Sequence, residues 1–327
     1  MTILITGATG LIGRALTQSL VDSGLRPRVV TRRPHRALEV FDSRVMAFEW
    51  HPRTEPFPAP ALDGVERVIH LMGEPLYGPL TRDKRARIVA SRRIGTKRLL
   101  EALGRTRVHL IVASSAAVYG YGEGPPVTET TAVQRPKDKL ALALLGCEEA
   151  ADHLRENGSI VTLVRLGAVI APEAFPEPLR DLFDRRMAWR KAHPDAAIPA
   201  IDHVDAVGLL AWLAQSRPLP GAIHAVAPEP LRSGALEQLL AQAMPRNART
   251  GVPRWLLRQR LGVLADFVHS QQRIVPQRAL DAGFVFSRPD PLESVRAVLA
   301  QHTAELAPQR GSLLGRRTAA KLARHLP

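Results

Sequence analysis

Residues 3–16 read ILITGATGLIGRAL: a short apolar run, then glycines at positions 7, 10 and 13, and then a helical pattern. A strand, a glycine turn and a helix in this order form the first βα unit of a dinucleotide-binding fold. Gly7, Gly10 and Gly13 have no side chain where the backbone must turn tightly and approach a pyrophosphate, and the start of the helix offers free N–H donors. The stretch therefore predicts a dinucleotide site. A glycine-rich structural turn without a ligand is the alternative.

Length and composition limit the class of protein. The chain has 327 residues, of which 45% are hydrophobic, so it can bury the core of a large α/β domain with a smaller lobe. No apolar run is long enough to span a bilayer, and we expect no membrane span. Cys147 is the single cysteine, which excludes an internal disulfide, fits a reducing cytoplasm and predicts no metal cluster.

The formal net charge of +14 raises the question of nucleic acid as a partner. The arginines, however, are spread along the chain in pairs, without interleaved aromatic residues and without a nucleic-acid-binding motif. We therefore expect no specific nucleic-acid binding, and we interpret most of these cations as solvated helix faces.

Apolar runs alternate with helical patterns through the first two-thirds of the chain, which predicts a Rossmann-type doubly wound parallel sheet. We expect a dinucleotide-binding domain over residues 1–170, with 200–226 returning to it. Residues 171–199 and 227–305 are expected to form a small, mainly helical substrate-side lobe, and 306–327 a basic tail. The expected strands are 2–6, 28–31, 45–49, 67–71, 109–114 and 160–164, with helices beginning near Leu11, Arg82, Lys139 and Val204.

The residues at the end of the second strand indicate whether such a fold binds NAD or NADP. NAD-binding chains usually place an acidic residue there for the ribose hydroxyls. Here the sequence is Thr31-Arg32-Arg33-Pro34, without an acid. Two guanidiniums suit a 2′-phosphate, because arginine forms paired, charged hydrogen bonds to phosphate oxygens. We expect NADP(H) as the cofactor; the alternative is two solvent-exposed arginines in a basic protein.

Several motifs in order resemble the atypical or extended short-chain dehydrogenase/reductase superfamily, in particular its epimerase-like, YfcH-type subfamily with a C-terminal extension. The resemblance covers roughly residues 1–300. Its motifs are TGATGLIG at 6–13, TRRP at 31–34, VIHLMGEP at 68–75, SRRIGT at 91–96, SSAAVYGYG at 114–122, DHVD at 202–205, VAPEP at 226–230, SQQRIVP at 270–276 and AGFVF at 282–286.

The resemblance implies a Rossmann domain that binds NADP(H), a C-terminal lobe over the substrate cleft, and a homodimer by analogy with other members. It also implies a set of cofactor-binding residues. These are Gly7, Thr9, Gly10, Leu11 and Ile12 at the pyrophosphate, Arg32 and Arg33 at the 2′-phosphate, Leu71, Met72, Gly73 and Glu74 along the cofactor, and Ser114 near the nicotinamide.

Short-chain reductases transfer a proton through a Tyr whose pKa is lowered by a Lys four residues later, and the physical reason is that a nearby cation stabilises the phenolate. No Tyr-x-x-x-Lys occurs in this chain. By position, Lys139 and Ala143 stand where that pair would be. The remaining catalytic candidates are Ser115, Tyr119 and Tyr121.

Two functions follow from these residues. The first is an NADP(H)-dependent oxidoreductase or epimerase-like enzyme acting on a small polar substrate, anionic or nucleotide-linked. The second is a non-catalytic NADP(H)-binding regulatory or redox-sensing protein. The glycine turn and Ser115 favour the first function, whereas the absent Tyr and Lys favour the second.

Overall fold

The computed structural model describes residues 1–76, 81–122, 124–172, 187–189, 195–243, 249–252, 265–266 and 270–306. Its centre is a seven-stranded sheet in the order β11-β6-β5-β4-β1-β2-β3, with every neighbouring pair parallel. This is the doubly wound arrangement that the sequence predicts. The strands are β1 (Ile3–Thr6), β2 (Arg28–Thr31), β3 (Met46–Glu49), β4 (Arg67–His70), β5 (His109–Ser115), β6 (Ile160–Leu166) and β11 (Gly221–Ala225).

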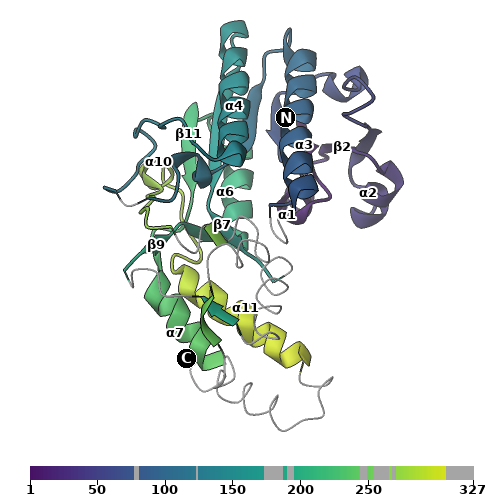
Figure 1. The fold of residues 1–327 in the computed structure, drawn as a ribbon. Helices are drawn as coiled ribbons and strands as arrows, with labels where there is room; N and C mark the ends of the chain where they lie inside the picture. Colours follow the sequence, from purple (N-terminus) through teal and green to yellow (C-terminus); the bar gives the residue numbers. More distant parts are fainter. Residues whose placement is uncertain are drawn as a thin grey trace.

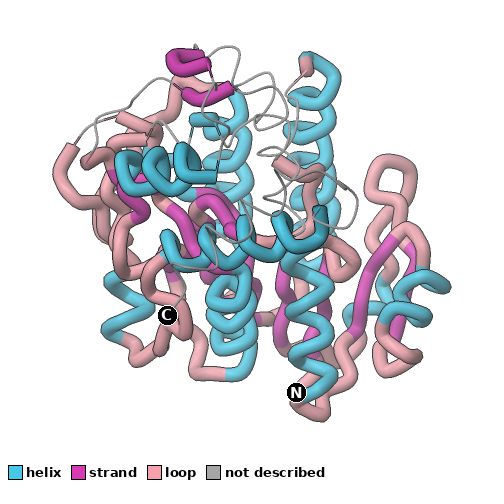
Figure 2. Tube along the Cα trace, turned by 90° about the horizontal axis from the view of Figure 1, so that it is seen from below, coloured by secondary structure: helices cyan, strands magenta, loops and turns pink. Residues whose placement is uncertain are grey.

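Helices cover both faces of the sheet, as Figures 1 and 2 show. On one face, α1 (Leu11–Asp22), α2 (Pro34–Val40) and α6 (His203–Gln215) enclose a core that includes Ile5 and Ile111. On the other face, α3 (Arg82–Leu103) and α4 (Lys139–Asp152) pack over Leu4 and Leu110. Burial on both faces explains why the strands are continuous apolar runs rather than alternating ones. In the described part of the chain, no helix combines the length and the apolar character needed to cross a membrane.

A smaller lobe extends from the sheet toward α7 and α11, at the lower end of Figure 1. Its core joins side chains of α7 (Ser233–Ala243) and α11 (Pro291–Leu306) to the short strands that follow the sheet. The remaining elements are η1 (Ala59–Leu62), η2 (Ala116–Tyr119), η3 (His153–Asn157), β7 (Ala168–Ile170), β8 (Met187–Trp189), β9 (Ala197–Ile198), β10 (Ala200–Asp202), β12 (Leu231–Arg232), β13 (Arg249–Val252) and α10 (Gln277–Asp281).

Several sequence expectations fall on residues that the structure does not describe. The sequence around Leu179–Arg190 has a helical pattern, but of these residues only 187–189 are described, and they form β8. Most of the helical pattern from 253 to 270, and the basic tail from 307 onward, lie outside the described residues.

The DHVD motif at 202–205 places Asp205 close to the N-cap of the helix expected near Val204, and the structure shows which of its two aspartates is the cap. The capping residue is Asp202, whose carboxylate accepts a hydrogen bond from the Val204 backbone N–H at 2.7 Å. Asp205 lies one turn further on and accepts from the backbone N–H groups of Ser287 and Arg288. Asp205 therefore ties the C-terminal segment to the sheet domain instead of capping its own helix.

A buried ion pair joins α4 to the sheet. Arg165 of β6 and Glu148 of α4 form a bidentate contact, with 2.7 Å between Nη2 and Oε2 and 3.1 Å between Nε and Oε1. The two side chains are 8% and 3% exposed. Because neither charge can return to water in the folded chain, each depends on the other.

We therefore expect Glu148→Ala to lower the free energy of unfolding by about 3–5 kcal/mol, since it leaves a buried guanidinium uncompensated. Denaturant titration measures this change. The control is Asp152→Ala on the same helix, which removes an exposed pair with Arg155 and should cost about 0–1 kcal/mol. Equal losses in the two variants would contradict a structural role for the buried pair.

Candidate functional site

The glycine turn between β1 and α1 depends on the absence of side chains. Gly7 has φ +74°, and a Cβ there would lie 2.8 Å from the carbonyl carbon of Leu71. A Cβ on Gly13 would lie only 2.1 Å from the carbonyl oxygen of Gly7. Gly10 is the N-cap of α1. Because it has no side chain that could accept a hydrogen bond, the backbone N–H groups in the first turn of α1 have no side-chain cap. These features form an anion cradle at the end of β1.

A cavity of about 270 Å³ opens beside this turn, at the carboxyl ends of β1, β4 and β5. Ligands of doubly wound sheets bind at this edge. Among the sequence-predicted residues, the following line the cavity: Gly7, Gly10, Leu11, Ile12, Leu71, Met72, Gly73, Glu74, Ser114 and Ser115. Thr9, Arg32 and Arg33 are exposed and do not line it. Arg32 and Arg33 follow β2, which pairs with β1, so they lie at the same edge of the sheet.

Two serines end β5 at the cavity. The Ser115 hydroxyl oxygen accepts a hydrogen bond from the Ala117 backbone N–H at 3.2 Å and thereby caps η2. The Ser114 hydroxyl is buried and has no hydrogen-bond partner among the described residues. A buried hydroxyl without a partner is costly, and a polar group of a ligand in the cavity would satisfy it.

Arg92 of α3 is a cavity residue that the sequence analysis missed. Its Nη1 donates to the Glu74 carbonyl oxygen at 3.0 Å, and its guanidinium lies against Gly73. Burial lowers the pKa of Arg92 to about 10. Within the described chain no carboxylate forms an ion pair with it. Arg92 is half-buried, and a partly desolvated guanidinium without an ionic partner favours an anionic group in the cavity.

Comparison with known proteins identifies the family. A family model described as "NAD dependent epimerase/dehydratase family" matches residues 3–193, more than half of the 327-residue chain. The chain belongs to this family. A second model, "Domain of unknown function (DUF1731)", matches residues 252–298, in the region of the expected C-terminal extension.

Relatives named as epimerase family proteins align with this chain along most of its length. The "Epimerase family protein SDR39U1 homolog, chloroplastic" of Arabidopsis thaliana is 27% identical, covering 91% of this chain and 87% of the relative. "Epimerase family protein YfhF" of Bacillus subtilis is 24% identical, covering 89% and 95%.

Solved structures of epimerases share the fold. Human SDR39U1, solved with NADPH, superposes with a TM-score of 0.74 at 20% identity, covering 91% of this chain and 99% of that one. UDP-glucuronic acid 4-epimerase from Bacillus cereus, solved with UDP-glucuronic acid and NAD, has a TM-score of 0.69 at 17% identity, covering 92% and 100%.

The two tyrosines that the structure describes, Tyr119 and Tyr121, are not among the residues that line the cavity. The Tyr119 hydroxyl accepts from Nη1 of Arg165 and lies 2.9 Å from Nε2 of His224. Since Nδ1 of His224 is 2.8 Å from the Val275 carbonyl oxygen and donates to it, Nε2 accepts from Tyr119. Burial raises the pKa of Tyr119, the opposite of what a proton-transferring tyrosine requires.

The other candidate groups are also outside the lining. Tyr121 is half-buried and packs against the core of the smaller lobe. Lys139 is exposed at the first turn of α4, and the residue that α4 contributes to the cavity is Leu144. In the part of the chain that the structure describes, no group of three or more His, Cys, Asp or Glu side chains is arranged to hold a metal ion.

His70, the last residue of β4, contacts side chains of β1 and α3. Its Nδ1 lies 2.7 Å from the Thr6 hydroxyl and its Nε2 lies 3.1 Å from the Thr96 hydroxyl. Burial, with a smaller contribution from the nearby Arg92 charge, lowers the pKa of His70 to about 4. The imidazole is therefore neutral in the folded chain at neutral pH.

This lowered pKa predicts a pH dependence of stability. The unfolded chain protonates His70 near the ordinary pKa of 6.5, but the folded chain does so only near pH 4. Between these values the unfolded state binds more protons, so the free energy of unfolding falls as the pH drops from about 6.5 to about 4. Denaturant titrations across this range should show a shallower slope for His70→Gln. Buried His109, whose pKa is likewise about 4, maintains a remaining slope. An unchanged slope in the variant would contradict the burial argument.

Proposed function

We propose that the protein binds NADP(H) at the glycine turn and acts as an oxidoreductase or epimerase-like enzyme on a small polar substrate. The observation that carries this proposal is the tight glycine turn, in which the backbone of Gly13 packs against the Gly7 carbonyl. The absence of side chains in this turn leaves the start of α1 open to a pyrophosphate. The partnerless Ser114 hydroxyl and the half-buried Arg92 fit a polar, anionic ligand in the same cavity. The NADPH of human SDR39U1 supports the choice of cofactor.

Each part of the cofactor has residues to receive it. We assign the pyrophosphate to Gly7, Thr9, Gly10, Leu11 and Ile12 and the 2′-phosphate to Arg32 and Arg33. Leu71, Met72, Gly73 and Glu74 border its middle, and Ser114 and Ser115 its nicotinamide end. When bound, the nicotinamide supplies or accepts a hydride. The chain's own part is to hold it at the carboxyl ends of the strands and to orient a substrate oxygen through the serine hydroxyls.

The substrate side of the cavity follows β6 and β7. Leu166, Gly167, Ala168 and Val169 line it, and β7 leads toward the smaller lobe. The lobe would then cover a substrate placed next to the nicotinamide. We favour an anionic, nucleotide-linked substrate, because Arg92 offers a half-buried cation at the cavity and because the Bacillus cereus epimerase was solved with UDP-glucuronic acid.

The role of Arg32 and Arg33 predicts selectivity between the two dinucleotides. The wild-type protein should bind NADPH more tightly than NADH, and Arg32→Ala/Arg33→Ala should weaken NADPH binding by about ten- to a hundredfold while leaving NADH binding nearly unchanged. Titration by nicotinamide fluorescence measures both affinities. The matched control is Arg36→Ala, which removes another exposed arginine from α2. Equal affinity of the wild type for NADPH and NADH would contradict the assignment of the 2′-phosphate.

A second candidate function, a cofactor-binding regulatory or redox-sensing protein, is favoured by the composition of the cavity. The titratable side chains among the described residues that line it are Glu74 and Arg92. Glu74 pairs with Arg87, and the guanidinium of Arg92 is a poor proton donor for hydride chemistry at neutral pH. This lining lacks the phenol and ammonium that short-chain reductases use.

Turnover separates the two functions. For an enzyme, UDP-glucose or UDP-glucuronic acid added with the oxidised cofactor should change the absorbance of the bound nicotinamide or yield an epimerised sugar. Gly13→Ala should abolish both cofactor binding and turnover, because its Cβ would lie 2.1 Å from the Gly7 oxygen. Gly146→Ala is the control, since a Cβ there meets nothing within 4 Å. Cofactor binding without any chemical change of either sugar nucleotide would favour the regulatory function.

A further inference from the structure

Arg92 brings a positive charge to the cofactor cavity. It is half-buried, and its guanidinium lies against Gly73, in the segment that follows β4 and lines the cavity. Its Nη1 donates to the carbonyl oxygens of Glu74 and Ile88, at 3.0 and 3.4 Å. Carbonyl oxygens orient a guanidinium but do not remove its net charge. The charge of Arg92 therefore acts on whatever occupies the cavity.

The carboxylate of Glu74 does not cancel this charge. Glu74 is the acidic residue among the described residues of the lining. Its Oε1 is 3.4 Å from Nε of Arg87, whose side chain is 51% exposed, so this ion pair lies partly in solvent. The pair is neutral as a whole, and an exposed pair is strongly screened. The described lining thus keeps the positive charge of Arg92.

A neighbouring side chain shows the effect of the same charge. Burial lowers the pKa of His70 to about 4, and the positive charge of Arg92 contributes to this shift. Arg92 itself, with a pKa of about 10, stays charged at neutral pH. A cationic imidazolium is thus unfavourable near Arg92, and a cationic aromatic ring of a ligand is unfavourable there for the same physical reason.

The two redox states of the nicotinamide differ in exactly one relevant charge. The ring of NADP⁺ is a pyridinium cation and the ring of NADPH is neutral, whereas their pyrophosphate and 2′-phosphate groups are the same. We propose that Arg92 makes the cavity select NADPH over NADP⁺. This inference rests on the proposed function, because it requires the nicotinamide to share the cavity that Arg92, Ser114 and Ser115 line.

Selection of the reduced form changes what the bound cofactor can do. A tenfold tighter binding of NADPH raises the midpoint potential of the bound couple by about 30 mV, so bound NADP⁺ becomes a stronger hydride acceptor. In an epimerase-like enzyme this favours the removal of a hydride from the substrate. In a regulatory protein it makes the loaded state report the reduced cofactor.

The ratio of the dissociation constants of NADP⁺ and NADPH tests the inference. Isothermal titration calorimetry of the full-length protein measures both. We expect the wild type to bind NADPH about ten- to fiftyfold more tightly, as a unit charge at a partly buried site implies. Arg92→Met keeps the length of the side chain without its charge and should lower this ratio at least about fivefold. Arg92→Lys keeps the charge and should retain most of the preference.

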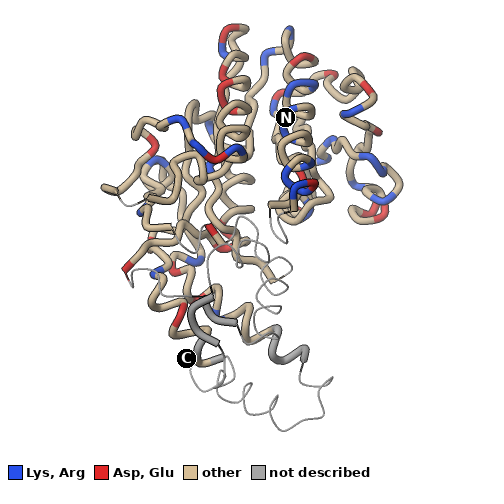
Figure 3. Tube along the Cα trace, viewed as in Figure 1, with Lys and Arg blue, Asp and Glu red and all other residues tan. Residues whose placement is uncertain are grey.

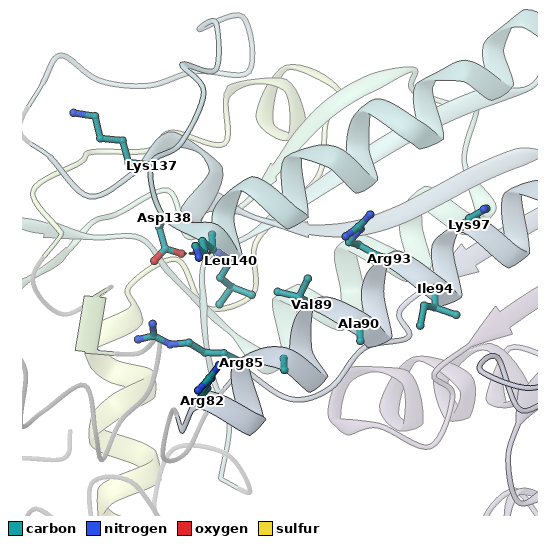
Figure 4. A pocket seen from close by; sticks show the side chains of 12 residues that line it. Arg82, Arg85, Val89, Ala90, Arg93, Ile94, Lys97, Lys137, Asp138 and Leu140 are labelled. Carbon is teal, nitrogen blue, oxygen red and sulfur yellow. Dashed lines mark hydrogen bonds between the residues drawn. The ribbon is translucent and has the colours of Figure 1, made fainter.

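The matched control is Arg93→Met. Arg93 is the next residue of α3, but it lines a separate basic groove between α3 and the start of α4, together with Lys97 (Figure 4). The substitution makes the same change in net charge and should leave the ratio unchanged. Because Arg92 also holds the carbonyl of Glu74, melting temperatures without cofactor show whether each variant is folded. Arg92→Gln, which keeps a side-chain donor, serves if Arg92→Met does not fold.

Three outcomes would overturn the inference. In the first, the wild type binds the two forms equally. In the second, Arg92→Met weakens both by the same factor, which would assign Arg92 to a phosphate of the cofactor. In the third, Arg93→Met shifts the ratio as much as Arg92→Met, which would make the preference an effect of total charge. A wild type that binds neither form would overturn the proposed NADP(H) site itself, so the two failures are distinguishable.

Discussion

The site depends on the close contact between the first turn of α1 and the end of β1. A side chain on Gly13 would collide with the Gly7 carbonyl oxygen, and one on Gly7 would collide with the backbone of Leu71. Only glycine at both positions lets α1 start directly above β1 and lets β4 run directly beside it. The cavity, the uncapped helix start and the alignment of β4 and β5 all follow from this approach.

Buried charge organises the region around this contact. Arg165 is neutralised by Glu148 and also holds the Tyr119 hydroxyl, so that tyrosine belongs to a link between η2, α4 and the sheet. Arg92 has only carbonyl acceptors among the described residues and faces the cavity. The two arginines illustrate opposite solutions to the same desolvation problem. One charge is satisfied within the protein, and the other is available to a ligand.

Helix α3 serves two surfaces. Ile88 and Leu99 are buried, Ser91 and Arg92 hold the segment after β4, and Arg85 and Arg93 line a separate basic groove that α3 forms with the start of α4. Because α3 carries Lys and Arg along most of its length (Figure 3), its overall amphipathic pattern is weak, and its sequence alone resembles a solvated face. Its position between a cofactor cavity and a basic groove gives the same arginines different surroundings, and with them different roles.

The sequence by itself determined the fold class, the six strands of the sheet's main part and the position of the glycine turn. It could do so because these features depend on local patterns: apolar runs buried on both faces, helix starts after capping residues, and glycines where a Cβ would collide. It also anticipated half of the residues that line the cavity, since these directly follow the strand ends. Tertiary structure decided the inward orientation of Arg92, the attachment of Asp205 to the backbone at Ser287 and the engagement of Tyr119 by Arg165 and His224. Each of these joins residues far apart in the chain, and whether a polar side chain meets solvent, a ligand or a buried partner is set by what packs against it rather than by its neighbours in sequence.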